Sequence, residues 1–293
     1  MIVPALLEEL RTRDIEVWVD GDQLRCNAPT GVLTPELRDQ LRQRKGAIMG
    51  FLRSAAALAR QERAIVPLQP RGARVPVFGV PGDNGDVFCY RFLAQHLGGD
   101  QPFFGLQPPG VDGQSEPLTS IEDLAAYFAA QIRAFRPNAP YVIAGYCAGG
   151  TIAFELARQL LQHGATVGFV ALFGSSYPTF FRGQERREAT RLAPPDPVLA
   201  VRLRVEEATR TGVCRYTPQY FAGRVGLFLP NSEWLRPGNR NEPLRWRAVA
   251  RETEEYCGPD VCEGDVMLLE PHARAIAALF RRCRENGRME GTR

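Results

Sequence analysis

A cysteine stands where a predicted strand turns into a predicted helix. Residues 141–144 (Tyr-Val-Ile-Ala) run directly into Gly145-Tyr146-Cys147-Ala148-Gly149-Gly150, and an amphipathic helix is expected over 151–163. In a Gly-x-nucleophile-x-Gly pattern, the glycines let the central residue occupy a strained turn above the edge of a sheet. The amide of the next residue then helps to bind an oxyanion. The spacing therefore predicts acyl-group chemistry with Cys147 as the nucleophile and Ala148 as an oxyanion donor.

The elements that would position this turn alternate between buried strands and amphipathic helices. Apolar runs predict strands over 75–80 and 167–173. Helical periodicity predicts one helix that begins at Phe92 and another over 121–135. A strand, a sharp turn, a helix and a further strand are typical of a doubly wound α/β sheet that is mostly parallel. We expect Cys147 at the carboxyl edge of that sheet.

A general base for the nucleophile is harder to find, because the chain has only three histidines. His96 and His163 fall on predicted helices, where we expect structural roles. His272 is the candidate base. If 265–269 were the last strand, His272 would stand at the strand-to-helix turn where such a base belongs. No metal site is expected.

Further segments of the large domain are similar to thioesterase domains of nonribosomal peptide and polyketide synthetases, which are α/β-hydrolases. The resemblance covers about residues 64–284. It implies a second oxyanion amide near Gly82 or Asp83 and a helical lid over about 180–213. It also implies that the acyl substrate arrives on the phosphopantetheine of a partner carrier protein, so that no cofactor of its own is expected. The segments that carry it are Phe78–Gly85, Phe104–Gly110, Tyr141–Tyr146 and Glu270-Pro271-His272.

The chain departs from this family at the partners of the nucleophile. The family often has an aspartate after the strand that follows the elbow helix, where this chain reads Gly174-Ser175-Ser176. Other members place the acid one strand later, where Asn231 or Glu233 could orient an imidazole. The family also writes Gly-Asp-His before its Glu-Pro-His, whereas Gly264-Asp265 is followed here by Val266.

A cysteine nucleophile depends less on a general base than a serine does. A free thiol with a pKa near about 8.5 is already partly ionised at neutral pH, and the helix N-terminus behind Cys147 is expected to lower that pKa further. Loading an acyl group onto Cys147 then needs little help, while hydrolysis of the product needs an activated water. We expect an enzyme that takes up an acyl or peptidyl group and transfers, cyclises or otherwise releases it. Two alternatives stay open: ordinary hydrolytic release or editing with His272 as base, and a non-catalytic carrier-binding scaffold.

The first 60 residues hold no catalytic cluster. Leu6, Leu7 and Leu10 lie at helical spacing, the segments 16–19 and 23–26 flank an Asp-Gly-Asp turn, and Thr34 precedes a further helix. One interpretation is a packing extension of the main domain. The segment also resembles the TubC-type N-terminal docking domain, with Lys45 where that family usually has a lysine. This small α+β domain would bind the charged tail of an upstream synthetase subunit along its hairpin.

Length and composition agree with one enzyme-sized domain and a small appendage. The 293 residues are 44% hydrophobic and carry a net charge of only +3, which disfavours nucleic acid or a membrane as partner. Seven scattered cysteines without a secretion signal indicate a cytoplasmic protein. The expected boundaries are a docking domain over 1–60, a linker over 61–75, a thioesterase-like domain over 76–285 and a flexible tail over 286–293.

Overall fold

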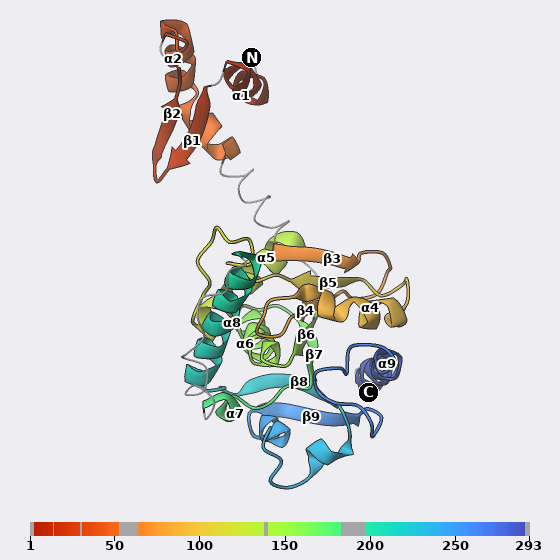
Figure 1. Cartoon of the computed structure of the whole chain (residues 1–293). Coiled ribbons are helices and arrows are strands. Elements are labelled where there is room, and N and C mark those ends of the chain that lie inside the picture. Colours follow the sequence, from red (N-terminus) through yellow and green to blue (C-terminus); the bar gives the residue numbers. More distant parts are fainter. Residues whose placement is uncertain are drawn as a thin grey trace. The chain divides into compact units, whose positions relative to one another are not determined.

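The computed structural model describes residues 3–13, 15–29, 31–52, 64–137, 140–182 and 197–290. The chain divides into two compact units, Met1–Arg63 and Ala64–Arg293, each of which is described by itself (Figure 1). Within the described ranges, no helix combines the length and the apolar character needed to cross a bilayer.

The N-terminal unit is a hairpin packed against helices. Its elements are α1 (Val3–Thr12), β1 (Glu16–Asp20), β2 (Gln23–Asn27) and α2 (Pro35–Gln43), and residues 45–52 are also helical. The two strands pair antiparallel around Gly21-Asp22, and Gly21 adopts the positive φ of 55° that such a turn needs. As expected, the hydroxyl of Thr34 accepts a hydrogen bond from the amide of Leu37 at 3.3 Å and so caps α2.

A small apolar core holds this unit together. Side chains from α1, α2 and the segments beside them are almost completely shielded from solvent, because the apolar positions recur on one face of each helix. The core residues are Leu6, Leu10, Ile15, Leu37, Leu41 and Ile48.

The large unit is built on a seven-stranded sheet with the order β3-β5-β4-β6-β7-β8-β9. Only β3 is antiparallel to its neighbour, so the expected mostly parallel sheet is confirmed. The strands are β3 (Ile65–Gln69), β4 (Val77–Val80), β5 (Phe103–Leu106), β6 (Tyr141–Tyr146), β7 (Val167–Phe173), β8 (Phe221–Leu229) and β9 (Ala250–Cys257).

Helices cover both faces of this sheet. α5 (Ile121–Phe135) and α6 (Gly149–Gln162) pack on one face, and α4 (Arg91–Leu97) and α9 (Ala273–Glu290) on the other (Figure 1). Because side chains alternate along a strand, each strand feeds both cores. In β7, for example, Val170 and Leu172 belong to the α5–α6 core, and Phe169 and Phe173 to the α4–α9 core.

Three sequence-based boundaries need correction. Residues 65–69, expected in the linker, form the edge strand β3, where Pro67 is tolerated because it lies in the outermost strand of the sheet. The last strand is β9 and not 265–269, which lie in turns. The expected tail begins too early, because α9 continues through residue 290. A single glycine inside that helix costs only about 1 kcal/mol and does not end it.

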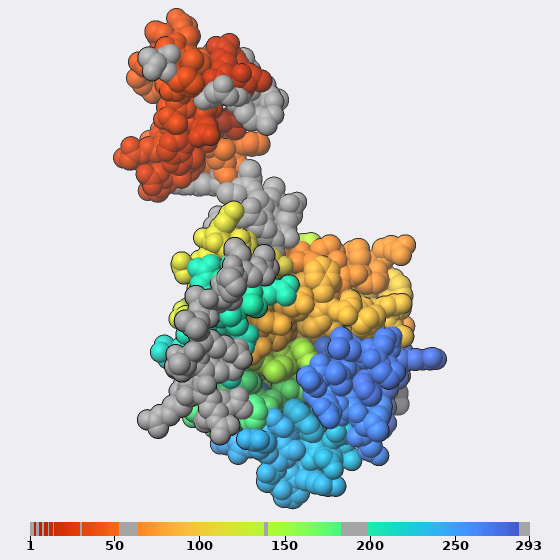
Figure 2. Space-filling view, viewed as in Figure 1, coloured from red at the N-terminus to blue at the C-terminus, as the bar shows by residue number. Residues whose placement is uncertain are grey.

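The expected lid region contains two helices, α7 (Thr179–Arg182) and α8 (Pro197–Arg215), while residues 183–196 lie outside the described part of the chain. α8 packs on loops that follow the central strands. A β-carbon on Gly85, in the loop after β4, would lie 3.3 Å from Cγ1 of Val205. In Figure 2, α8 forms part of the surface beside α6. Three short 3₁₀ helices complete the unit: η1 (Val87–Tyr90), η2 (Ser232–Leu235) and η3 (Pro243–Ala248).

Candidate active site

The predicted strand–turn–helix is present, with Cys147 at its apex. β6 ends at Tyr146 and α6 begins at Gly149. Cys147 has φ of 52°, a left-handed conformation that costs a side-chain-bearing residue energy and that clusters at functional sites. Its amide donates to the carbonyl of Phe173 at 3.0 Å, which ties the turn to the end of β7.

The glycines of the turn are there because nothing larger fits. A β-carbon on Gly149 would lie only 1.9 Å from the carbonyl oxygen of Pro81, and one on Gly145 would lie 2.5 Å from the carbonyl oxygen of Gly149. The backbones of β4, β6 and α6 therefore approach closely around Cys147. This is the packing that a nucleophile elbow requires.

Burial is the main influence on the thiol. It raises the pKa of Cys147 to about 11, and the nearby carboxylate of Asp83 adds to the rise. A hydrogen bond from the amide of Ala148 and the guanidinium of Arg210, on α8, both act to lower this pKa. The three groups come from the loop after β4, the elbow and the lid helix, so the thiol lies between opposite charges.

The expected lowering of the pKa at the start of the helix is present, but the net pKa of the thiol is raised. The Ala148 amide does favour the thiolate, but desolvation outweighs it. With a pKa of about 11, only about one molecule in 10⁴ carries a thiolate at pH 7. A more basic thiolate is intrinsically more nucleophilic, which recovers about half of the loss on a logarithmic scale. Few thiolates are thus present at neutral pH, but each is intrinsically more reactive.

The two predicted oxyanion donors both lie near Cys147. The amide of Ala148 is oriented toward the sulfur, and a β-carbon on Gly82 would stand 4.0 Å from Cβ of Cys147. The amide of Gly82 also hydrogen-bonds to the sulfur of Cys89. The loop after β4 therefore borders the nucleophile, and a role for these amides in binding an oxyanion stays a prediction.

The segment in which the family carries its histidine lies beside the elbow. The hydroxyl of Tyr146, the residue before the nucleophile, donates to the carbonyl oxygens of Gly264 at 2.9 Å and Asp265 at 3.0 Å. The next residue is Val266. The backbone is thus held close to Cys147, but the side chain at this position cannot accept a proton.

His272 lies just before α9, separated from β9 by the whole loop 258–272. The premise that placed it at a strand-to-helix turn is wrong, because 265–269 do not form a strand. It is not among the groups that influence the pKa of Cys147. Within the described part of the chain, His272 therefore has no contact that would make it the base.

The two candidate orienting groups have other partners. Asn231 caps η2: its Oδ1 accepts from the amide of Glu233 at 3.0 Å, and its Nδ2 donates to the carbonyl of Cys262 at 2.7 Å. Glu233 is exposed and pairs with Arg236 at 3.3 Å. In the earlier acid position, Ser176 donates to Oδ1 of Asn241 at 2.9 Å. None of these contacts, all between described residues, involves an imidazole.

The other two histidines have structural contacts, as expected. Nε2 of His96 lies 2.5 Å from Oε1 of Glu270, and Nδ1 of His163 lies 2.7 Å from the carbonyl of Gln159 in its own helix. His96 thereby holds the segment before α9 against α4. Neither imidazole is among the groups that set the pKa of the nucleophile.

The sequence did not point to Arg210 or to the side chain of Asp83. The resemblance drew attention to Asp83 only for its amide, and Arg210 is one of many arginines in a helix with no clear apolar face. Their influence on Cys147 depends on how α8 and the loop after β4 pack, which no local pattern encodes.

The sheet order and the elbow define an α/β-hydrolase. Comparison with protein families narrows this further: residues 75–214 match the thioesterase domain, and residues 3–54 match the TubC N-terminal docking domain. The thioesterase-like segment and the docking segment that the sequence predicts are therefore each matched by a family model of their own. Both resemblances drawn from the sequence are confirmed.

Curated relatives are much larger proteins. The chain is 40% identical over 109 residues to an inactive atromentin synthetase of Paxillus involutus, covering 37% of this chain and 11% of that protein. It is 37% identical over 128 residues to the indigoidine synthase of Dickeya dadantii, covering 42% of this chain and 9% of that protein. It is 26% identical over 250 residues to a dimodular nonribosomal peptide synthase of Bacillus subtilis, covering 72% of this chain and 10% of that protein. The chain thus spans about a tenth of the length of these relatives.

Solved structures agree on the fold. The NocB thioesterase domain from the nocardicin cluster superimposes with a TM-score of 0.62 at 21% identity, over 75% of this chain and 97% of that one. A four-domain nonribosomal peptide synthetase gives a TM-score of 0.63 at 18% identity, over 75% of this chain and 20% of that one.

Proposed function

We propose that this thioesterase domain takes an acyl or peptidyl group from a carrier-protein thioester onto Cys147 and passes it to an acceptor other than water. One observation supports this most directly. The elbow is complete around a cysteine, while the adjacent position where the family has its base holds Val266.

In the loading step, the sulfur of Cys147 attacks the thioester carbonyl of the donor. A new carbon–sulfur bond forms on Cys147, the bond to the pantetheine sulfur breaks, and the proton of Cys147 ends on the departing thiol. Both states are thioesters, so the exchange is close to balanced in free energy. In this proposal the amide of Ala148, which hydrogen-bonds to the sulfur of Cys147, would stabilise the negative oxygen of the intermediate.

Deacylation distinguishes the possible acceptors. Water is a weak nucleophile and needs a general base, whose contribution is typically about 10²–10⁴-fold. An amine or a thiol is intrinsically more nucleophilic and depends on that base much less. The acyl group on Cys147 should therefore persist in water and leave when such an acceptor arrives.

Intact-protein mass spectrometry with an acyl-loaded carrier tests the proposal. We expect an added acyl mass that persists for many minutes and disappears when an amine or thiol acceptor is added. Cys147→Ala should remove the adduct, whereas Cys257→Ala, at a partly buried thiol on β9, should leave it unchanged. Rapid formation of free acid would favour the hydrolytic alternative. No adduct with any donor would favour a non-catalytic scaffold.

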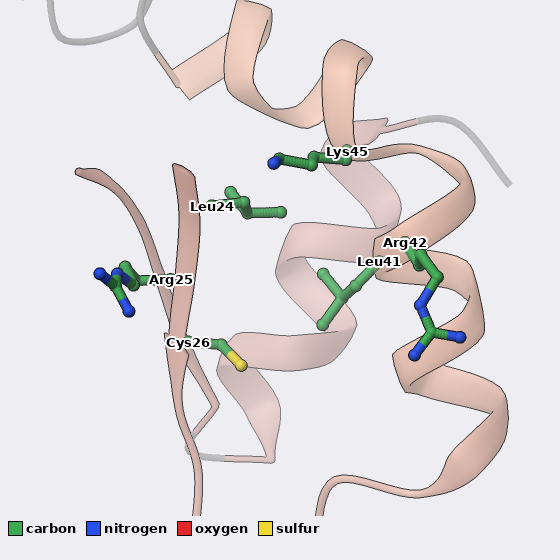
Figure 3. A pocket seen from close by; sticks show the side chains of 6 residues that line it. All are labelled: Leu24, Arg25, Cys26, Leu41, Arg42 and Lys45. Carbon is green, nitrogen blue, oxygen red and sulfur yellow. The ribbon is translucent and has the colours of Figure 1, made fainter. Parts of the chain in front are cut away.

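The docking unit has a groove between β2 and the helices, with a volume of about 130 Å³. Figure 3 shows that Leu24, Cys26, Leu41 and Lys45 point into this space, while Arg25 and Arg42 flank it and point outward. Arg25 pairs with Asp20 and Arg42 with Asp39, so Lys45 provides the positive charge inside the groove. This supports docking of an extended acidic peptide from an upstream synthetase subunit, with main-chain pairing along β2.

Peptide titration tests the docking proposal. A peptide with alternating glutamate and leucine should bind the full-length chain, and Lys45→Glu should weaken binding at least about tenfold because it reverses the charge inside the groove. Arg38→Glu makes the same charge change at an exposed position of α2 outside the groove. Equal weakening by both variants, or stronger binding of a lysine-containing peptide, would contradict the acidic partner.

A further inference from the structure

A second hollow lies in the excursion between β8 and β9 and has a volume of about 330 Å³. It begins at the same edge of the sheet as the nucleophile, because β6, β7 and β8 are parallel and Cys147 and η2 follow the carboxyl ends of β6 and β8. Ligands of open α/β sheets bind along this edge.

One wall of the hollow is linked to the elbow by direct contacts. Cζ2 of Trp234 would lie 3.3 Å from a β-carbon on Gly264, and the carbonyl of Gly264 accepts the hydroxyl hydrogen bond of Tyr146. Trp234 is thus separated from the residue preceding the nucleophile by one loop residue. A molecule bound against Trp234 would lie next to the loop that borders Cys147.

The polar part of the lining is rich in arginine. Arg236, Arg240 and Arg245 all line the hollow. Arg236 pairs with Glu233 at 3.3 Å and Arg245 with Glu242 at 2.9 Å. Among the described residues, Arg240 has no carboxylate within ion-pair distance, so the hollow carries an excess positive charge. Guanidinium groups bind phosphate through paired N–H donors.

The remaining lining is apolar. Trp234 and Leu244 stand with Pro237 and Pro243 beside the arginines. A ligand that suits both parts has an anionic end joined to a short branched apolar segment. A free inorganic anion would leave this apolar wall uncovered, and a purely apolar acyl chain would leave the charge unpaired.

We infer that this hollow binds the phosphate end of the pantetheine arm of the acyl donor, with Arg240 as the main contact and the Trp234–Pro243 wall against the dimethyl segment of the arm. The inference rests on the proposed function for the identity of the donor. It adds a site, separate from the nucleophile, that would recognise the phosphate of the donor independently of the acyl group.

Donors that differ only in phosphate test it. The rate of acyl transfer to Cys147 is measured with acyl-pantetheine, acyl-4′-phosphopantetheine and the carrier-linked donor. We expect Arg240→Gln to raise the apparent KM for both phosphorylated donors about tenfold, which corresponds to the loss of one hydrogen bond between charged groups. The apparent KM for acyl-pantetheine should change by less than about twofold. Arg251→Gln, at an exposed arginine of β9 outside the hollow, is the matched control.

The other outcomes each decide against the inference. An equal loss with acyl-pantetheine would mean that Arg240 acts on the fold and not on phosphate. A loss confined to the carrier-linked donor would indicate a docking surface for the carrier protein. Calorimetric binding of unacylated 4′-phosphopantetheine and of pantetheine to the Cys147→Ala variant separates this site from the chemistry. Tighter binding of the phosphorylated compound supports the hollow even if Cys147 is never acylated, and equal binding refutes it.

Discussion

The elbow and the loops that follow β8 and β9 belong to the same edge of the sheet but differ in what they keep of the geometry expected around a nucleophile. The elbow keeps every backbone feature that exposes a nucleophile, from the positive φ of Cys147 to the close contact of Gly149 with Pro81. The two loops keep their position near the elbow, but their polar side chains serve the loops themselves, as Asn231 does. The backbone geometry of the elbow is thus present at this edge, while the polar side chains considered as its partners are engaged elsewhere.

Replacing the predicted nucleophile should have the largest effect and tests the difference between the elbow and the neighbouring loops. Cys147→Ser keeps the elbow but replaces the thiol by a hydroxyl that needs a general base. Because the proposed mechanism provides no such base, acyl loading should fall at least about 10³-fold. The acyl adduct is measured by intact-protein mass spectrometry. Serine loading at a rate near that of cysteine would mean that a base is present after all.

The packing of the elbow is tested by Gly149→Ala. The added carbon would lie 1.9 Å from a backbone oxygen, so β4 and α6 must separate, and we expect unfolding to become about 3 kcal/mol easier. Urea denaturation measures the change. Gly168→Ala is the control, because its β-carbon would make only ordinary contacts of 3.6 Å in β7. A similar cost at both positions would show that the elbow is not tightly packed.

Val266→His tests the proposal that this position lacks a general base. The backbone at this position is held beside the elbow by Tyr146, so an imidazole there can reach water at the acyl group. Without an orienting acid we expect hydrolysis of the adduct to accelerate about tenfold. Val261→His places the same side chain at a residue that is 81% exposed in the same loop, and it should leave hydrolysis unchanged.

Substitution of the charged residues around the thiol should have the smallest effect, and this effect is on the rate of alkylation of Cys147. Since the pKa of Cys147 is raised to about 11, its alkylation by iodoacetamide should rise about tenfold per pH unit from pH 7 to 10, without a plateau. Asp83→Asn removes a charge that raises this pKa, so alkylation at pH 8 should increase about threefold, and Arg210→Gln should decrease it by a similar factor. Peptide mass spectrometry assigns the modified cysteine. A plateau below pH 9 would indicate a nearby imidazolium.

Sequence patterns predicted the elements that have a clear apolar signature. The helix over 121–135 and the strand over 167–173 have the expected bounds, and Thr34 caps its helix. β9 was missed because Ala-Arg-Glu-Thr-Glu-Glu-Tyr-Cys is dominated by charged residues, which a strand at the edge of a sheet tolerates. β3 was missed because it contains a proline.

The site was predictable to the extent that its chemistry is local. The elbow motif identified Cys147 and Ala148 because turn, glycines and nucleophile are adjacent in the chain. The pKa of the thiol was not predictable, because burial follows from tertiary packing and the nearby charges of Asp83 and Arg210 lie outside the motif. The same holds for Arg210, whose place beside the nucleophile depends on tertiary structure alone.

A thiol that is protonated in nearly every molecule reacts slowly with any donor. Small electrophiles and freely diffusing thioesters collide briefly and almost always meet the unreactive form. A donor delivered by a docked partner stays at high effective molarity through many ionisation events and eventually meets the thiolate. The desolvation that slows Cys147 would thus lower its reaction with all donors alike, and the high effective molarity of a tethered donor would favour that donor over free metabolites.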